Sequence, residues 1–143
     1  MKRASWILLA IVGALTLLGS IGSLFTAYRP SAPDALTPTT TIDDITAGRT
    51  DVATAIRARR GTAAAFAAAY SVLFLSIVLG PYRRGDTWSW WTLLAGAATL
   101  AVLTAARLPA LGTSAGAATG LIPLGVVVVA LLLDVGRVRA PRS

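Results

Sequence analysis

The chain of 143 residues contains no cysteine and no histidine, and its six acidic residues are all aspartate. Without cysteine it can form no disulfide, thiol redox couple or thiolate metal site. Without histidine and glutamate it can build no Ser-His-Asp triad, HExxH zinc site or carboxylate-bridged di-iron site. Most catalytic repertoires are therefore excluded, and we predict a protein that is not an enzyme and binds no metal or cofactor.

Charged residues are also scarce, at 13% of the chain, whereas an ordinary soluble domain has roughly 25%. Hydrophobic residues make up 55% of the sequence, and the mean hydropathy is +0.71. A water-soluble domain of this length cannot bury so much apolar surface, so the composition predicts a bilayer as the solvent.

Four uncharged stretches are long enough to cross about 30 Å of hydrocarbon, which takes about 20 helical residues. We predict a single domain over residues 1–143 that is all-α, an integral membrane antiparallel four-helix bundle with a short extracytoplasmic amphipathic helix. The predicted spans lie at about 5–28, 62–82, 87–106 and 114–134, and the extracytoplasmic segment at 29–60.

The first span has an alternative, a cleaved secretory signal, because Lys2 and Arg3 precede its apolar run. The run is longer than the roughly 7 to 15 apolar residues of a signal, and Phe25-Thr-Ala-Tyr28 is a poor cleavage site. We therefore expect the first span to remain as an anchor.

The distribution of Lys and Arg predicts the orientation. The tight Arg83-Arg84 connector and both short tails are basic, and the positive-inside rule weights short loops most. This predicts a multi-pass protein of the bacterial cytoplasmic membrane, with both termini in the cytoplasm.

The first part of the outer segment contains Pro30, Pro33 and Pro38 and should form an extended linker. Thr41-x-x-Asp44 then fits a capping box, with Ile42 and Ile45 in the short amphipathic turn that follows.

Thr50 or Asp51 can cap a second helix whose apolar face comprises Val52, Ala55 and Ile56. This pattern predicts an interfacial helix that leads into the second span. The segment could act as a lid or partner-binding element, but we favour a connector resting on headgroups.

The sharpest local pattern runs from Pro81 to Trp91. Two arginines can meet anionic headgroups, the aromatic side chains suit the membrane interface, and Asp86 can cap the next helix. We predict a membrane-interface anchor, with a headgroup or partner site as the alternative. An anchor should tolerate Arg83→Lys and Trp90→Tyr. The predicted residues are Tyr82, Arg83, Arg84, Asp86, Trp88, Trp90 and Trp91.

Small residues at helical spacing predict close helix packing. Ala64 and Ala68 favour it within the second span, and two further patterns have the spacing of dimerisation motifs. These are Gly19-x-x-x-Ser23 and Gly116-x-x-x-Gly120.

The layout and the run Pro-Tyr-Arg-Arg-Gly-Asp-Thr-Trp-Ser-Trp-Trp resemble small four-helix bacterial membrane proteins. Those proteins carry an Arg-(Arg/Lys)-Gly-(Glu/Asp)-x-Trp-x-Trp-(Trp/Tyr) motif after the second span, and some are distantly DoxX-like. The resemblance implies the four-helix fold and transfers no activity. The alanine-rich second span and the high arginine content are also typical of a high-GC bacterial source.

These patterns favour a non-catalytic accessory or structural membrane protein, and a small-solute transporter or channel component is the alternative. Small proton-coupled transporters need an acid within the membrane, whereas Asp86 falls at an interface and Asp134 is expected in an exposed pair with Arg137. A holin-like lysis protein fits poorly. The expected partners are the bilayer, anionic headgroups and a membrane-protein partner or second copy, with no nucleic acid.

Overall fold

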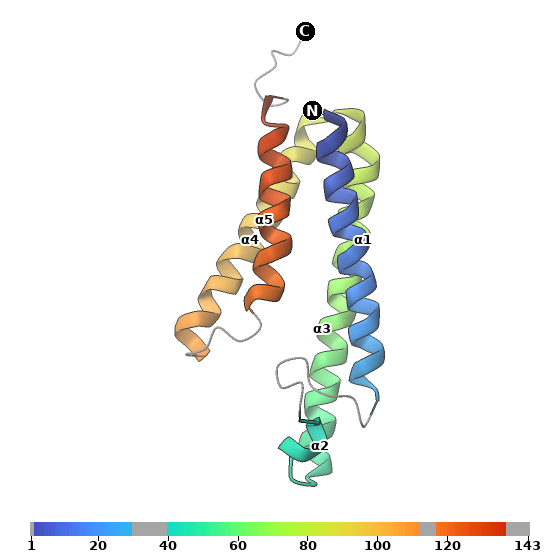
Figure 1. Cartoon of the computed structure of the whole chain (residues 1–143), viewed down its shortest axis with the longest axis vertical. Coiled ribbons are helices and arrows are strands. Elements are labelled where there is room, and N and C mark those ends of the chain that lie inside the picture. Colours follow the sequence, from blue (N-terminus) through green and yellow to red (C-terminus); the bar gives the residue numbers. More distant parts are fainter. Residues whose placement is uncertain (1, 30–39, 112–116, 137–143) are drawn as a thin grey trace. The chain divides into compact units, whose positions relative to one another are not determined.

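The computed structural model describes residues 2–29, 40–111 and 117–136, and 89% of this described part is helical, with no strand (Figure 1). This confirms the predicted all-α class. The elements in chain order are the following: α1 (Lys2–Ala27), α2 (Ile42–Ile45), α3 (Thr50–Ile77), the π-helix η1 (Val78–Tyr82), α4 (Thr87–Leu111) and α5 (Ala117–Leu133).

Three helical segments of the described chain are long and apolar enough to cross a membrane: Ala4–Ala27, Thr50–Tyr82 and Thr87–Ala106. They correspond to the first three predicted spans. The fourth apolar segment, Leu121–Leu133, is shorter. The predicted start of that span, and the Gly116 end of its small-residue motif, lie outside the described residues, as do the proline linker and the C-terminal arginines.

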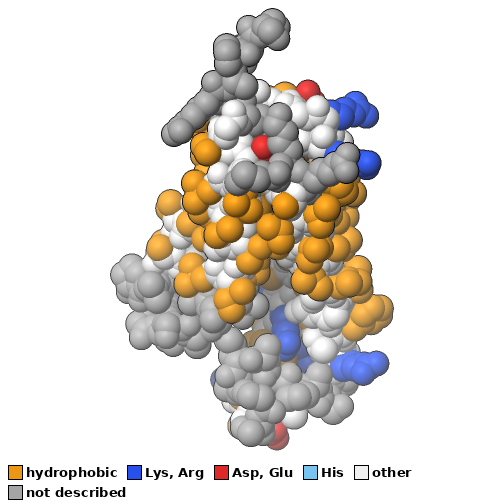
Figure 2. All heavy atoms as spheres, turned by 45° about the horizontal axis from the view of Figure 1, so that its top comes forward, with side chains coloured by type: hydrophobic (Ala, Val, Ile, Leu, Met, Phe, Trp, Pro, Cys, Tyr) orange, Lys and Arg blue, Asp and Glu red, His pale blue; other side chains and the backbone are white. Residues whose placement is uncertain are grey.

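The outer faces of these helices are apolar. Phe66 is 74% exposed and Ile122 is 68% exposed, and many other large hydrophobic side chains are also uncovered. Hydrophobic side chains cover much of the described surface in Figure 2. Several buried positions, in contrast, are occupied by serine, including Ser5, Ser20 and Ser71. An apolar exterior around small and polar interior residues is compatible with a membrane-spanning protein.

The start of α3 differs from the prediction. The carbonyl of Arg49 accepts the first helical bond from the N–H of Ala53, so Arg49 is the cap residue and Thr50 and Asp51 lie in the first turn. Ala53 is buried and Ala55 is exposed. The prediction that Ala55 belongs to the packed apolar face was therefore wrong. The helix then continues without interruption to Ile77, so the predicted interfacial helix and the second span form one helix.

The α3 helix widens into a π-helix at its end, where Pro81 interrupts the regular hydrogen-bonding pattern. Proline has no N–H and its ring clashes with the preceding turn, and π-turns relieve such strain. The carbonyl of Pro81 accepts from the N–H groups of Gly85 and Asp86. Gly85 has a φ of +104°, a conformation that L side chains rarely adopt, and this closes the turn into α4.

Contacts divide the chain into two compact units, one of Met1–Ala14 with Val72–Ser143 and the other of Leu15–Ser71. The buried residues of the first unit form one hydrophobic cluster. It includes Leu9 from α1, Val78 from η1, Leu93 from α4 and Leu131 from α5. The prediction of a single domain stays a prediction.

Close helix approach in the first unit occurs at Gly13, which the sequence motifs did not include. A Cβ at this position would lie 2.8 Å from Leu75 Cδ2 and 3.0 Å from Phe74 Cδ1. Gly19, by contrast, has open space where a Cβ would stand. Ala64 is buried, as close packing requires, and Ala68 is half-buried.

Candidate functional site

The seven predicted anchor residues divide into two groups. Arg83, Arg84, Asp86, Trp88 and Trp91 are exposed, as interface anchors would be. Tyr82 is completely buried and Trp90 is 7% exposed, so these two side chains pack inside the protein, and the anchoring role of the seven residues stays a prediction. Both side chains make hydrogen bonds inside the protein.

The Tyr82 hydroxyl lies 2.6 Å from the hydroxyl of Ser5, which is also completely buried. Ser5 Oγ donates its only proton to the main-chain carbonyl of Ala130 at 2.7 Å. Tyr82 must therefore donate to Ser5, and the three groups form a directed chain from η1 through α1 to α5.

Trp90 makes a similar contact one residue further along α5. Its indole Nε1–H donates to the carbonyl of Leu131 at 3.0 Å. Leu131 and Ala130 belong to the last turn of α5, where carbonyls have no partner within the helix. The Leu131 carbonyl also accepts from the N–H of Asp134, so Trp90 adds a second donor there. Ser5 supplies a side-chain donor to the Ala130 carbonyl, and an unpaired carbonyl in a low-dielectric environment would cost several kcal/mol.

The sequence carried a signal for the burial of Trp90. Trp90, Leu93 and Ala97 are spaced i, i+3, i+7 and form one helical face, and all three are buried. Trp91, on a different face, is 54% exposed and meets Trp90 edge-on, with the ring centroids 4.9 Å apart. For Ser5, a single serine in an apolar helix gives no comparable local signal.

Arg83 lies over the ring of Trp6, with its guanidinium carbon 5.0 Å from the ring centroid. This cation–π geometry holds the arginine against the first helix and leaves its side chain exposed. Trp6 was not among the predicted site residues. Asp86 immediately precedes Thr87, the first residue of α4, and so occupies the cap position that the sequence predicted.

Asp134 follows the last residue of α5 and is 3% exposed. The prediction of an exposed aspartate was therefore wrong, and its predicted partner Arg137 lies outside the described residues. The N–H of Asp134 donates to the carbonyl of Leu131, a bond of the 3₁₀ type that tightens the end of the helix.

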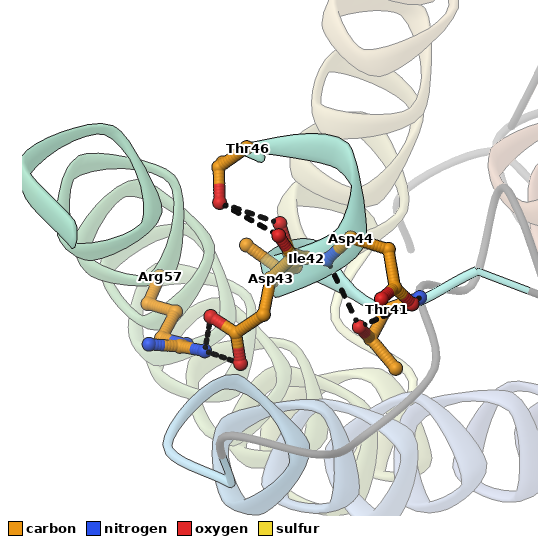
Figure 3. A network of polar contacts seen from close by, with 6 residues as sticks. All are labelled: Thr41, Ile42, Asp43, Asp44, Thr46 and Arg57. Atoms are coloured by element: carbon orange, nitrogen blue, oxygen red, sulfur yellow. Dashed lines mark hydrogen bonds and ion pairs between the residues drawn. The ribbon is translucent and has the colours of Figure 1, made fainter. Parts of the chain in front are cut away.

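A second polar group centres on α2 (Figure 3). The predicted capping box is confirmed: Thr41 Oγ1 accepts from the N–H of Asp44, and the Asp44 carboxylate accepts from the N–H and hydroxyl of Thr41. The side-chain hydrogen bond, followed by the main-chain one, lowers the pKa of Asp44 from its ordinary value of 3.8.

Asp43 ties this turn to α3. Arg57 Nη2 donates to both carboxylate oxygens of Asp43, at 2.7 and 2.8 Å (Figure 3). Ile42 is buried beneath the turn, whereas Ile45 is 53% exposed, so only the first isoleucine of the predicted pair packs inward. This ion pair joins residues 14 positions apart and was not predicted.

Among the described residues, no group of three or more acidic side chains could hold a metal ion. The polar atoms described above instead make bonds that fix helix ends and turns. No family model, curated protein or solved structure matches this chain. The resemblance to four-helix membrane proteins with the arginine and tryptophan motif stays a prediction.

Proposed function

We propose that the chain is a non-catalytic accessory or structural protein of the bacterial plasma membrane. The observation that carries this proposal is the use of the polar groups around η1. Ser5, Tyr82 and Trp90 bind one another and the carbonyls of α5, which leaves their hydrogen-bonding groups engaged within the fold. Such an arrangement stabilises a scaffold and provides no reactive group for chemistry.

The proposal includes four antiparallel spans with both termini in the cytoplasm. The beginning of α1 at Ser5, the end of η1 at Tyr82, the beginning of α4 at Trp90 and the end of α5 at Leu131 all meet within the first unit. Four helices with alternating directions account for this meeting. The positive charge of Arg83 and Arg84 supports the cytoplasmic assignment of this end.

Cysteine accessibility tests this topology, and the absence of native cysteine removes background labelling. With four spans, Thr39→Cys and Thr113→Cys should react with an impermeant thiol reagent on intact cells. Arg84→Cys and Ser143→Cys should react only after lysis. Labelling of both Thr39→Cys and Ser143→Cys on intact cells would mean that α5 does not cross the membrane. The opposite labelling pattern at all four positions would mean that the orientation is reversed.

The exposed part of the motif requires its own test. If Arg83 and Arg84 serve as an anchor, the double variant Arg83→Lys, Arg84→Lys should keep expression, topology and any phenotype that deletion reveals. A recognition site would need the planar fork of arginine. Normal insertion combined with the deletion phenotype would therefore contradict the anchoring proposal.

Buried Asp134 favours a second candidate function, proton-coupled transport, because buried acids in membrane proteins mark ion pathways. Proteoliposomes carrying a membrane potential and an internal pH-sensitive dye test it directly. A transporter should show a proton flux that Asp134→Asn removes. The absence of flux with the unmodified protein would exclude this candidate.

A further inference from the structure

A groove runs along the beginning of the apolar part of α3, within the unit Leu15–Ser71. Its volume is about 400 Å³. The lining residues are Tyr28, Gly61, Thr62, Ala65, Phe66 and Ala69. The α3 residues of this set span two helical turns, or roughly 12 Å along the helix. One wall is Phe66, which is 74% exposed.

The groove begins where charged residues give way to apolar ones. Arg60 is the last charged residue of α3 before the apolar stretch, and Tyr28 ends the apolar run of the first helix. Tyr28 and Gly61 lie side by side, because a Cβ at Gly61 would be 2.8 Å from Tyr28 Oη. Tyrosine prefers the membrane interface, so the mouth of the groove lies at headgroup depth.

A cationic side chain stands at this mouth. Arg59, Thr62 and Phe66 are spaced i, i+3, i+7 and therefore share one side of the helix. Arg59 is exposed, whereas the nearby Arg57 is held by Asp43 and Arg49 pairs with Asp51. The position therefore combines an apolar channel directed into the hydrocarbon with an available positive charge at its outer end.

We propose that the groove binds one acyl chain of an anionic phospholipid, whose phosphate contacts Arg59. Charge complementarity selects the headgroup, and the small side chains of Ala65 and Ala69 make room for the chain. The site differs from the predicted anchor at residues 82–91. It rests on the proposal that α3 spans the membrane.

Native mass spectrometry of the full-length protein can test this site. The protein is released from micelles that contain equal amounts of phosphatidylglycerol and phosphatidylcholine with identical acyl chains. The unmodified protein should retain phosphatidylglycerol in preference to phosphatidylcholine. Arg59→Gln should reduce that preference about fivefold, because this is the factor by which one arginine near an anionic surface strengthens binding. Arg49→Gln, which alters an exposed arginine three turns away, should leave the preference unchanged.

Filling the groove gives the second arm. Ala65→Leu should remove the retained lipid, whereas Ala63→Leu should not, because Ala63 is also exposed but does not line the groove. Far-UV circular dichroism checks that both variants remain folded. If the Ala65→Leu variant does not fold, Ala69→Leu takes its place in the experiment.

Equal retention of the two lipids by the unmodified protein would overturn the proposal. So would equal lipid binding by the Ala65→Leu and Ala63→Leu variants. Binding of glycerol phosphate with the same Arg59 dependence would mean a headgroup site without a chain groove, and this would also overturn it. Failure of the four-span topology, in contrast, appears in the cysteine labelling and not in these ratios.

Discussion

The two units differ in the kind of polar contact that each contains. In the unit that contains both ends of the chain, the hydrogen bonds of Ser5 and Trp90 join residues 77, 125 and 41 positions apart. In the unit Leu15–Ser71, the capping box joins residues three apart and the ion pair of Arg57 joins residues 14 apart. One unit depends on tertiary packing, and the other on local motifs close to water.

The largest expected effect concerns Trp90. Trp90→Ala removes a buried aromatic ring and the donor to the Leu131 carbonyl, so the free energy of unfolding should fall by about 3–5 kcal/mol. Trp91→Ala, at an exposed neighbour, is the matched control and should cost far less. Unfolding in mixed dodecyl maltoside and SDS micelles measures both. Equal losses would mean that Trp90 is not a core residue.

Gly13 tests the close approach within the same unit. Gly13→Ala places a methyl group 2.8 Å from Leu75 and should destabilise the protein by about 1–3 kcal/mol through overpacking. Gly22→Ala lies on the same helix with open space around it and should be neutral or stabilising. The same unfolding assay compares them. Equal stability of the two variants would contradict the observed packing.

The Tyr82 and Ser5 pair should show coupling of about 1–2 kcal/mol, the upper range for hydrogen bonds between membrane helices. A double-mutant cycle of Ser5→Ala and Tyr82→Phe isolates this term. Additive effects of the two substitutions would show that the hydroxyl contact contributes nothing measurable.

The smallest effect belongs to the local unit and depends on pH. Because the pKa of Asp44 is lowered on folding, its carboxylate stabilises the α2 turn above about pH 3.8, and this contribution is lost as pH falls through the folded value. Thr41→Val should move the pKa of Asp44 back toward 3.8. Thr46→Val, in the same turn, should leave it unchanged. Carboxyl chemical shifts from NMR titration give these values, and an unshifted Asp44 in the unmodified protein would contradict the capping box.

The comparison also explains which features could be predicted. Apolar length alone predicted α1, α3 and α4, and the Thr41 and Asp44 spacing predicted a capping box because both partners lie within one turn. The role of Ser5 could not be predicted, since its partners lie at residues 82 and 130 and no local pattern connects them. The burial of Asp134 was missed for the same reason, because tertiary packing and not local sequence determines it.

The bond between Ser5 and Ala130 has a consequence for biogenesis. Its two partners are separated by 125 residues, so at 5–20 residues per second the ribosome needs about 6 to 25 s to deliver the second after the first. Throughout that interval the serine hydroxyl is already made but its acceptor is not. A chain truncated before α5 would keep that donor without the Ala130 carbonyl, so this helix-to-helix bond can form only after the last helix has been made.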